Sequence, residues 1–426
     1  MSLKVLVVDS SARGHALAWK LAQSPRVSKI YCAPGNPGTA EIAENISISP
    51  TAVSSLADFV EKNRIDLTVV GTEDAIDACI ADEFSRRCLR IAAPLASAGK
   101  IETSKIFMKR FLHRIGVSIA PFEVVHNYRE AMALVAQHGY PIVAKADGIA
   151  RGKGVYVCRR WREADDAFYG FFIEKKMSTA TRFGVVIEDF LSGEEVSAHA
   201  FCSGRDTLHL PLSCDYKPRY EDNRGLNTGG MGGYSPVDWV SVAVEERMKR
   251  EIIDAVARAM HEEHIPFVGV MYPGIILTPD PVVLEINARP GDPEFQILLR
   301  RLVSDMVNPI ESCIEGTLRV CVMEWSPSYA VAVTLVSGGY PTEATPPIAR
   351  IYGLEDARRI PGVEIFHAGT TLIDGVLYAA GGRVLSLTTL GTTLEEARGL
   401  AYEAVGCITY EGMGYRTDIG CRMRME

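Results

Sequence analysis

The feature that most constrains the fold is a regular alternation of short apolar segments and amphipathic segments near the start of the chain. Buried strands are expected at 4–8, 29–33, 67–70 and 89–93, with helices near 16–22, 52–63 and 74–86. Apolar strands that alternate with helices are typical of a parallel sheet covered on both faces. The sequence therefore predicts an α/β fold that begins with a doubly wound domain.

Beyond residue 100 the alternation gives way to other patterns. Ser104 is a good helix cap, and apolar residues follow it at helical spacing up to Gly116, which can end the helix. The later elements are a β-rich segment with one helix at 122–190, strands around a long loop at 213–236, a helix near 243–263, strands at 329–336, 372–379 and 383–388, and a helix near 394–405.

We expect these elements to form four modules, of fold class α/β and in part α+β. They are an N-terminal α/β domain at 1–100, a central domain made of 101–121 and 191–326, a small domain inserted at 122–190, and a C-terminal α/β domain at 327–426.

The charge of the chain narrows its partners. Its 45 lysines and arginines against 53 acids leave a net charge of −8, which gives no general attraction to nucleic acid or to an anionic membrane.

No apolar run approaches the roughly 18 residues of a membrane span, and the start is too quickly polar for a signal peptide. The ten cysteines form no CxxC pair, so free thiols in a reducing compartment are favoured over a disulfide framework. We expect a cytoplasmic monomer or dimer that acts on small molecules.

A glycine-rich turn between two strands is the first candidate site. Lys145 lies on a strand, and Gly148, Gly152, Lys153 and Gly154 follow. Glycines let backbone N–H groups approach phosphate oxygens, and lysines supply positive charge. The spacing differs from that of a P-loop, which needs four residues between its glycines and a Ser or Thr after its lysine. The segment is either a flap over nucleotide phosphates or an ordinary hairpin with exposed lysines.

Two further segments place acids at the ends of apolar strands. The strand at 185–188 runs into Asp189 and a turn with Glu195, where it can face an adenine edge and ribose hydroxyls, or can end in solvated acids. On the strand at 282–289, Glu285, Asn287 and Arg289 share one face because strand side chains alternate. Oxygen ligands of this kind suit Mg²⁺, and an arginine can grip a carboxylate or phosphate. A buried structural salt bridge is the alternative.

A glycine-rich loop at 213–234 is the last candidate segment. It combines Asp215 and Lys217 with Asn227 and several glycines. Such a loop can close over a substrate, and a merely mobile surface loop is the alternative.

Together these segments resemble the ATP-grasp superfamily, and more closely the phosphoribosylamine–glycine ligase family of purine biosynthesis. The matching runs follow the family's order and include APGNPGTA, KADGIARGKGV, VVIEDFLSGEE, NTGGMGGYSP, LEINARPGDPEFQ, FHAGT and GGRV. The resemblance implies an ATP-grasp fold in which 1–100 is a Rossmann-like domain and 122–190 is the lid. It also implies that ATP phosphorylates the carboxylate of glycine, and that the amine of 5-phosphoribosylamine then attacks to give glycinamide ribonucleotide, ADP and phosphate.

The resemblance further implies roles for individual residues. Those expected to hold ATP are Lys105, Lys145, Gly152, Lys153, Gly154, Glu188, Asp189, Phe190, Leu191 and Glu195. Those expected at the glycine and amine site are Arg13, His15, Asp215, Lys217, Asn227, Thr228, Gly229, Gly230, Met231, Arg289 and Asp292. Glu285 and Asn287 would bind Mg²⁺ or Mn²⁺, and the catalytic residues would be Arg289, Lys145 and Asp215.

The chain departs from the family's pattern at the first turn. The family has GSGGREHA after its first strand, where this chain has Asp9-Ser10-Ser11-Ala12-Arg13-Gly14-His15-Ala16. A phosphate at this turn would meet fewer free amides and an added negative charge. Smaller departures are Gly71-Thr72-Glu73, Cys214-Asp215-Tyr216-Lys217 and Arg289-Pro290-Gly291-Asp292. These leave open a related ligase that joins an amino acid to a different amine and, less favoured, a non-catalytic nucleotide-binding regulator.

Overall fold

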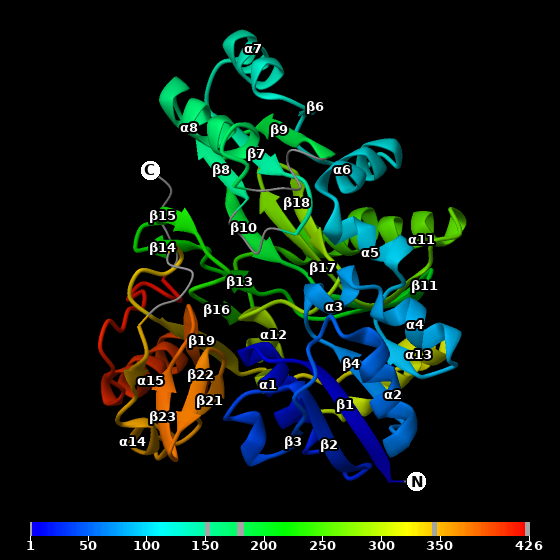
Figure 1. Cartoon of the computed structure of the whole chain (residues 1–426), viewed down its shortest axis with the longest axis vertical. Helices are drawn as coiled ribbons and strands as arrows, with labels where there is room; N and C mark the ends of the chain where they lie inside the picture. Colours follow the sequence, from blue (N-terminus) through cyan, green and yellow to red (C-terminus); the bar gives the residue numbers. More distant parts are fainter. Residues whose placement is uncertain (1, 150–153, 177–182, 343–346, 422–426) are drawn as a thin grey trace.

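The structure is a computed structural model that describes residues 2–149, 154–176, 183–342 and 347–421. Its N-terminal part is a parallel sheet with the strand order β3-β2-β1-β4-β5 (Figure 1). The strands are β1 (Leu3–Asp9), β2 (Val27–Pro34), β3 (Glu44–Asn45), β4 (Leu67–Val70) and β5 (Ile91–Ala92). The helices are α1 (Ala12–Leu21), α2 (Val53–Asn63), α3 (Glu73–Asp77) and α4 (Ile80–Arg86).

This sheet confirms the expected doubly wound, Rossmann-like fold. Leu6 and Val8 of β1 belong to one buried cluster, whereas Val5 and Val7 belong to another, so both faces of the strand are covered. The single helix expected near 74–86 is instead the pair α3 and α4, because Cys79 between them adopts a left-handed conformation with φ of 61°.

The inserted part is an antiparallel sheet with the order β6-β9-β7-β8. It consists of β6 (Phe122–Val125), β7 (Ile142–Ala146), β8 (Val155–Cys158) and β9 (Val185–Asp189), with α7 (Tyr128–His138) and α8 (Trp161–Phe172) packed on it. Its apolar side chains form a buried cluster of their own. It stands as a separate body at the top of Figure 1, above the central sheet.

The central sheet has the order β10-β17-β11-β12, with β18 beside β17. Its strands are β10 (Glu194–Ser197), β11 (Ala200–Gly204), β12 (Asp206–His209), β17 (Phe267–Leu277) and β18 (Pro281–Asn287). The helices around it are α5 (Ala96–Thr103), α6 (Lys105–Arg114), α10 (Val242–Met248), α11 (Ala255–Glu262), α12 (Glu294–Arg301) and α13 (Val307–Glu315). Ser104 caps α6 as expected, since its hydroxyl accepts the N–H of Phe107 at 3.1 Å.

The segment 213–236, expected as a loop, contributes strands to two further sheets. It contains β13 (Cys214–Asp215), the hairpin of β14 (Pro218–Tyr220) and β15 (Arg224–Asn227), and β16 (Gly232–Ser235). The strand order β13-β16-β19-β24-β21 joins it to β19 (Tyr329–Val336), β21 (Glu364–His367) and β24 (Arg383–Gly391). The expected module boundary near residue 327 therefore lies between strands of one sheet.

The C-terminal part also corrects one expected strand. The segment 372–379 is a hairpin of β22 (Thr370–Ile373) and β23 (Val376–Ala379), because Asp374 and Gly375 both have positive φ and turn the chain. β20 (Ala349–Arg350), α14 (Leu354–Arg358) and α15 (Leu394–Cys407) complete this part.

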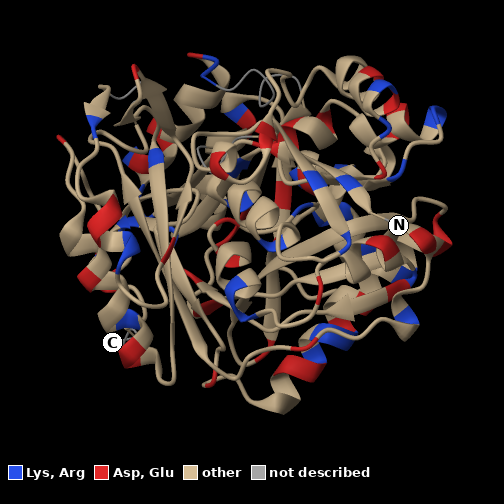
Figure 2. Cartoon of the chain, turned by 90° about the horizontal axis from the view of Figure 1, so that it is seen from below, with Lys and Arg blue, Asp and Glu red and all other residues tan. Residues whose placement is uncertain are grey.

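Acidic and basic side chains are interspersed over the elements seen in Figure 2. In the described part of the chain, no helix has both the length and the apolar character that a bilayer crossing requires. The cysteines are free thiols, as expected.

Candidate active site

A cavity of about 570 Å³ lies between the lid sheet, the central sheet, the N-terminal domain and the C-terminal strands. The predicted site residues that line it are Arg13, Lys145, Glu188, Asp189, Phe190, Leu191, Glu195, Asp215, Lys217, Asn227, Thr228, Gly229, Glu285, Asn287, Arg289 and Asp292. The structure thus brings together, in one cleft, segments that are far apart in the sequence.

The other predicted residues lie elsewhere. Lys105 lines a smaller adjoining cavity that shares Glu285 and Asn287 with the cleft, and its ammonium group donates to the carbonyl of Gly148 at 2.9 Å. His15 is buried on α1, and its Nδ1 accepts the N–H of His367 at 2.9 Å. Gly154, Gly230 and Met231 are buried and do not line the cleft. Gly152 and Lys153 lie outside the described residues.

The lid wall of the cleft carries a buried carboxylate held by two lysines. Glu188 on β9 forms ion pairs with Lys145 on the neighbouring strand β7 and with Lys109 on α6. Burial opposes the charge of Glu188, but the two lysines outweigh it and keep its pKa below the ordinary value. Burial and the charge of Lys145 lower the pKa of Lys109 to about 8. Two lysines therefore share one carboxylate at this wall, where Lys145 and Glu188 line the cleft and Lys109 lies behind them.

Lys109 was not among the predicted residues. It lies four residues after Lys105 on one face of α6, and this spacing is the signal that could have found it. Lys145 also donates to the carbonyl of Leu284 at 3.1 Å, which ties the lid to β18.

The edge strand β18 carries the two predicted metal ligands. Glu285 accepts a charged hydrogen bond from Lys217 at 3.0 Å. The attraction of Lys217, then of Lys145 and Lys105, outweighs burial and lowers the pKa of Glu285 to about 2. Asn287 is fixed by donation from its Nδ2 to the carbonyl of Tyr272 at 3.3 Å. Both side chains line the cleft and the adjoining cavity.

This oxygen pair fits a magnesium ion. Glu285 is ionised at neutral pH, and the amide oxygen of Asn287 lies on the same strand face. Among the described residues, no group of three His, Cys, Asp or Glu side chains is placed to hold a metal by itself. Mg²⁺ commonly takes one or two protein ligands and completes its shell with phosphate and water, so the pair suits a metal that arrives with a nucleotide.

Arg289, two residues further along, is surrounded by acids from the N-terminal half. Its Nε lies 2.8 Å from Oε2 of Glu73 and 3.1 Å from Oε1 of Glu102. Burial opposes its charge, but these two acids raise the pKa of Arg289 above its usual value. Its Nη1 donates to the carbonyl of Pro290 at 3.1 Å. The guanidinium is therefore charged and held at the junction of the N-terminal domain and the central sheet.

Two further acids, Asp215 and Glu294, line the cleft. Burial and the nearby charge of Glu294 raise the pKa of Asp215 well above its ordinary value. Glu294 accepts hydrogen bonds from Ser197 at 2.9 Å and from the hydroxyl of Tyr272. A carboxylate whose pKa is raised in this way is a stronger base than an ordinary one, which makes Asp215 a candidate proton acceptor.

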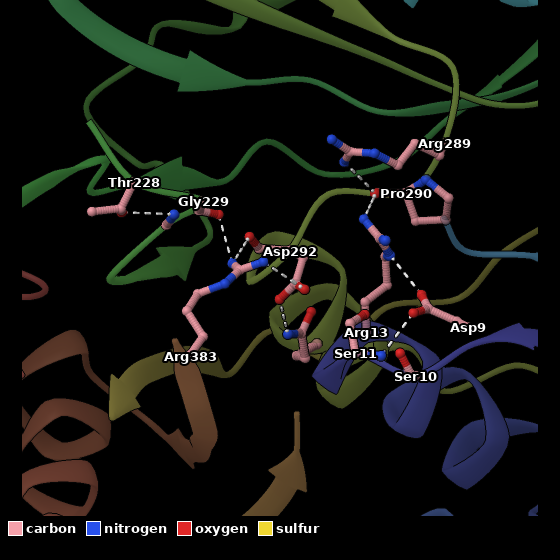
Figure 3. Close-up of polar contacts among 12 residues, drawn as sticks. Asp9, Ser10, Ser11, Arg13, Thr228, Gly229, Arg289, Pro290, Asp292 and Arg383 are labelled. Carbon is pink, nitrogen blue, oxygen red and sulfur yellow. Dashed lines mark hydrogen bonds and ion pairs between the residues drawn. The ribbon is translucent and has the colours of Figure 1, made fainter. Parts of the chain in front are cut away.

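Glu294, Tyr272 and Arg383 are cleft residues that the sequence reasoning missed. Glu294 directly follows the glycine- and proline-rich turn after the strand at 282–289. This position is the sequence signal that could have identified it as a site residue. Arg383 belongs to the GGRV run, but its partners come from distant segments. It donates to the carbonyls of Gly229 and Asp292 at 2.6 Å each and pairs with the Asp292 carboxylate at 3.0 Å (Figure 3).

Apolar side chains line the mouth of the cleft beneath the lid. Val143, Val155 and Val157 from the lid sheet lie among the lining residues together with Ile276 and Leu284 from the central sheet. A flat aromatic ring gains most from such a slot, because both of its faces leave water. The backbone of Asp189–Leu191 borders the same region.

These features define the class of protein. An antiparallel lid sheet with Lys145 on its strand β7 lies above an antiparallel central sheet with Glu285 and Asn287 on its strand β18, and this is the arrangement of an ATP-grasp ligase.

Comparisons with known proteins identify the family. The chain matches the N domain of phosphoribosylglycinamide synthetase over residues 3–102, its ATP-grasp (A) domain over residues 103–295 and its C domain over residues 330–422. Phosphoribosylamine–glycine ligase from Caldanaerobacter subterraneus subsp. tengcongensis is 39% identical over 418 residues, covering 98% of this chain and 99% of that protein. The ligase of the same name from Brucella melitensis is 40% identical over 421 residues, covering 99% and 98%. The chain belongs to the phosphoribosylglycinamide synthetase family.

Solved structures agree with this assignment. The crystal structure of phosphoribosylamine–glycine ligase from Thermotoga maritima superposes with a TM-score of 0.82 at 30% identity, covering 98% of this chain and 100% of that one. The biotin carboxylase domain of the Hydrogenobacter thermophilus 2-oxoglutarate carboxylase, solved with MgADP, shares the fold with a TM-score of 0.72 at 15% identity, covering 97% and 92%.

Proposed function

We propose that this chain joins glycine to 5-phosphoribosylamine at the expense of ATP, giving glycinamide ribonucleotide, ADP and phosphate in purine biosynthesis. The observation that carries the proposal is the cleft, because its lining residues come from all three family-matched regions. The names of the relatives support the substrates. They give no support to a related ligase with a different amine.

The lid end of the cleft would hold the nucleotide. The apolar slot suits adenine, Lys145 and Lys105 would contact the phosphates, and Glu195 would contact the ribose. Glu285 and Asn287 would hold Mg²⁺, or Mn²⁺, which supplies charge neutralisation between the phosphates. The fixed lysines stabilise the charge that develops on the phosphate oxygens as the glycine carboxylate attacks. This end would therefore form the acyl phosphate.

The opposite wall would hold the two remaining substrates. Arg289 is charged and fixed by Glu73 and Glu102, so it can steady the acyl phosphate. Asp215, Lys217 and the loop 227–229 line the same part of the cleft. Asp215 lies in this part of the cleft with a raised pKa, so its carboxylate, once ionised, would be basic enough to accept the proton that the attacking amine releases.

A non-catalytic regulator is disfavoured by this complete set of groups. The cleft is lined by all four residues that are expected to bind the phosphates and the metal, namely Lys145, Glu285, Asn287 and Arg289.

Substrate-dependent ADP release tests the proposal. Purified protein with MgATP should release ADP only when both glycine and 5-phosphoribosylamine, generated in situ, are present, and the product should have the mass of glycinamide ribonucleotide. Release with other acid–amine pairs and none with this pair would support the related ligase. ATP binding without turnover with any pair would support the regulator.

A further inference from the structure

The turn between β1 and α1 holds a carboxylate of the chain itself. Asp9 ends β1, is 3% exposed and lines the cleft. Its Oδ1 accepts the N–H of Ser11 at 2.7 Å, and its Oδ2 accepts the Nε–H of Arg13 at 3.0 Å (Figure 3). An amide and a guanidinium are the groups that would otherwise bind an external anion at this turn.

Two glycines make room for this carboxylate. A Cβ atom added at Gly14 would lie 2.5 Å from the Cβ of Asp9, and one added at Gly71 would lie 2.2 Å from its Oδ2. Both distances are far below van der Waals contact. The strand end β1, the helix α1 and the segment after β4 are therefore shaped around the Asp9 side chain.

The guanidinium of Arg13 is already engaged by three oxygen-bearing groups. Besides Asp9, its guanidinium donates from Nη1 to the carbonyl of Pro290 at 3.0 Å, and its Nη2 lies 3.9 Å from Glu73. Within the described part of the N-terminal domain, Arg13 is the one cation that lines the cleft, and Asp9, Glu73 and Asp74 line it as acids.

A phosphate at this turn would face two costs. It would have to displace the Asp9 carboxylate from Ser11 and Arg13, which leaves that carboxylate buried and unpaired. It would also meet like charge within a few ångströms, in a partly enclosed cleft where screening is weak.

We propose that Asp9 is a specificity-determining residue that occupies the anion-binding groups of the β1–α1 turn and so excludes phosphate from this end of the cleft. One consequence rests on the proposed function. Phosphoribosylamine would bind with its ribose hydroxyls facing Asp9 and with its 5-phosphate directed away from this turn.

Inorganic phosphate is the probe for this proposal. Its dissociation constant is measured by calorimetry on the full chain, with the triphosphate site filled by magnesium and a non-hydrolysable ATP analogue. Asp9→Gly frees Ser11 and Arg13 and removes the charge, so phosphate should bind at least about tenfold more tightly than to the wild-type chain. Asp9→Asn keeps the shape but not the charge and should give a smaller gain. Sulfate soaked into Asp9→Gly crystals should lie at residues 11–13 and be absent there in the wild type.

Asp74→Asn is the matched control. It removes one negative charge from the same end of the cleft without freeing the groups that Asp9 holds, so phosphate affinity should change less than about twofold. A gain equal to that of Asp9→Gly would replace the proposal with a simple net-charge effect.

Equal phosphate affinity in the wild type and Asp9→Gly, whether strong or absent, would overturn the proposal. If Asp9→Gly does not fold, Asp9→Asn decides the outcome by the same comparison. Binding of the ATP analogue is recorded first in each titration. Its absence would count against the proposed function, while the phosphate comparison could still be completed on the nucleotide-free proteins.

Discussion

The two ends of the cleft use the same kinds of side chain to opposite effect. At the lid end, the single carboxylate of Glu188 is shared by Lys145 and Lys109, so positive charge is left over. At the N-terminal end, Arg13 and Arg289 are surrounded by the three acids Asp9, Glu73 and Glu102, so no positive charge is left over. The two ends therefore differ in the ratio of cations to acids rather than in whether a cation is present.

The largest expected effect concerns the metal site proposed at the lid end. Glu285→Gln keeps the size of the side chain but removes the charge that would hold Mg²⁺. Turnover, measured as ADP release, should fall about 10³-fold or more at ordinary Mg²⁺ concentrations. The apparent Mg²⁺ requirement should rise while thermal stability is retained. Unchanged turnover with an unchanged Mg²⁺ requirement would remove the metal assignment.

The second prediction separates the two lysines on Glu188. Lys145 lines the cleft and Lys109 does not, although both pair with the same carboxylate. Lys145→Met should lower kcat by about 10²–10³-fold, whereas the matched control Lys109→Met should affect stability more than kcat. Equal losses of kcat would mean that the lysines act through Glu188 rather than on the phosphates.

The third prediction concerns the pH dependence of stability that arises from His15 on α1 and His367 on β21. Burial, then His367 and Arg358, lower the pKa of His15 to about 3, and burial and Arg358 lower that of His367 to about 4. In the unfolded chain these two histidines bind protons near pH 6.5, whereas in the folded chain they stay neutral until a much lower pH. The free energy of unfolding should therefore fall as pH drops from 6.5 toward 4. Each histidine contributes about 1.4 kcal/mol per pH unit over this range.

Urea unfolding at a series of pH values measures this slope. His15→Asn supplies an uncharged acceptor to the N–H of His367 and should remove the contribution of one proton from the slope. At the lid end, Glu285 with a pKa of about 2 stays ionised in the folded chain over the same range, so its charge should not change between pH 6.5 and 4. A slope that is the same in His15→Asn and the wild type would exclude this explanation.

The smallest expected effect tests the packing around Asp9. Gly71→Ala places a methyl group 2.2 Å from Oδ2 of Asp9, which should destabilise the chain by about 1–3 kcal/mol. In an Asp9→Gly background the three atoms nearest to this methyl group, all of them in the Asp9 side chain, are gone, and the same substitution should cost much less. Thermal unfolding of the four proteins in this cycle gives the coupling, and additive effects would show that the glycine does not serve Asp9.

Much of this structure could be predicted from local pattern. The alternation in the first hundred residues predicts the parallel sheet, because burial on both faces demands continuous apolar strands. The two-residue period of β18 places Glu285 and Asn287 on one face, and Ser104 and Gly116 mark the ends of a helix. The loop expected at 213–236 was wrong as secondary structure. Its strand β16 pairs with β19, which is about a hundred residues away, and β13 pairs with β16.

What the sequence by itself determined is therefore the layers, the family and the residue types that the cleft would need, since these depend on periodicity and on short motifs. Only the tertiary structure decided which charges are already neutralised. The second lysine on Glu188, the acids around Arg289 and the anchoring of Arg383 all join segments far apart in the chain. The energy of an ion pair depends on distance and burial, and neither quantity is written in the order of the residues.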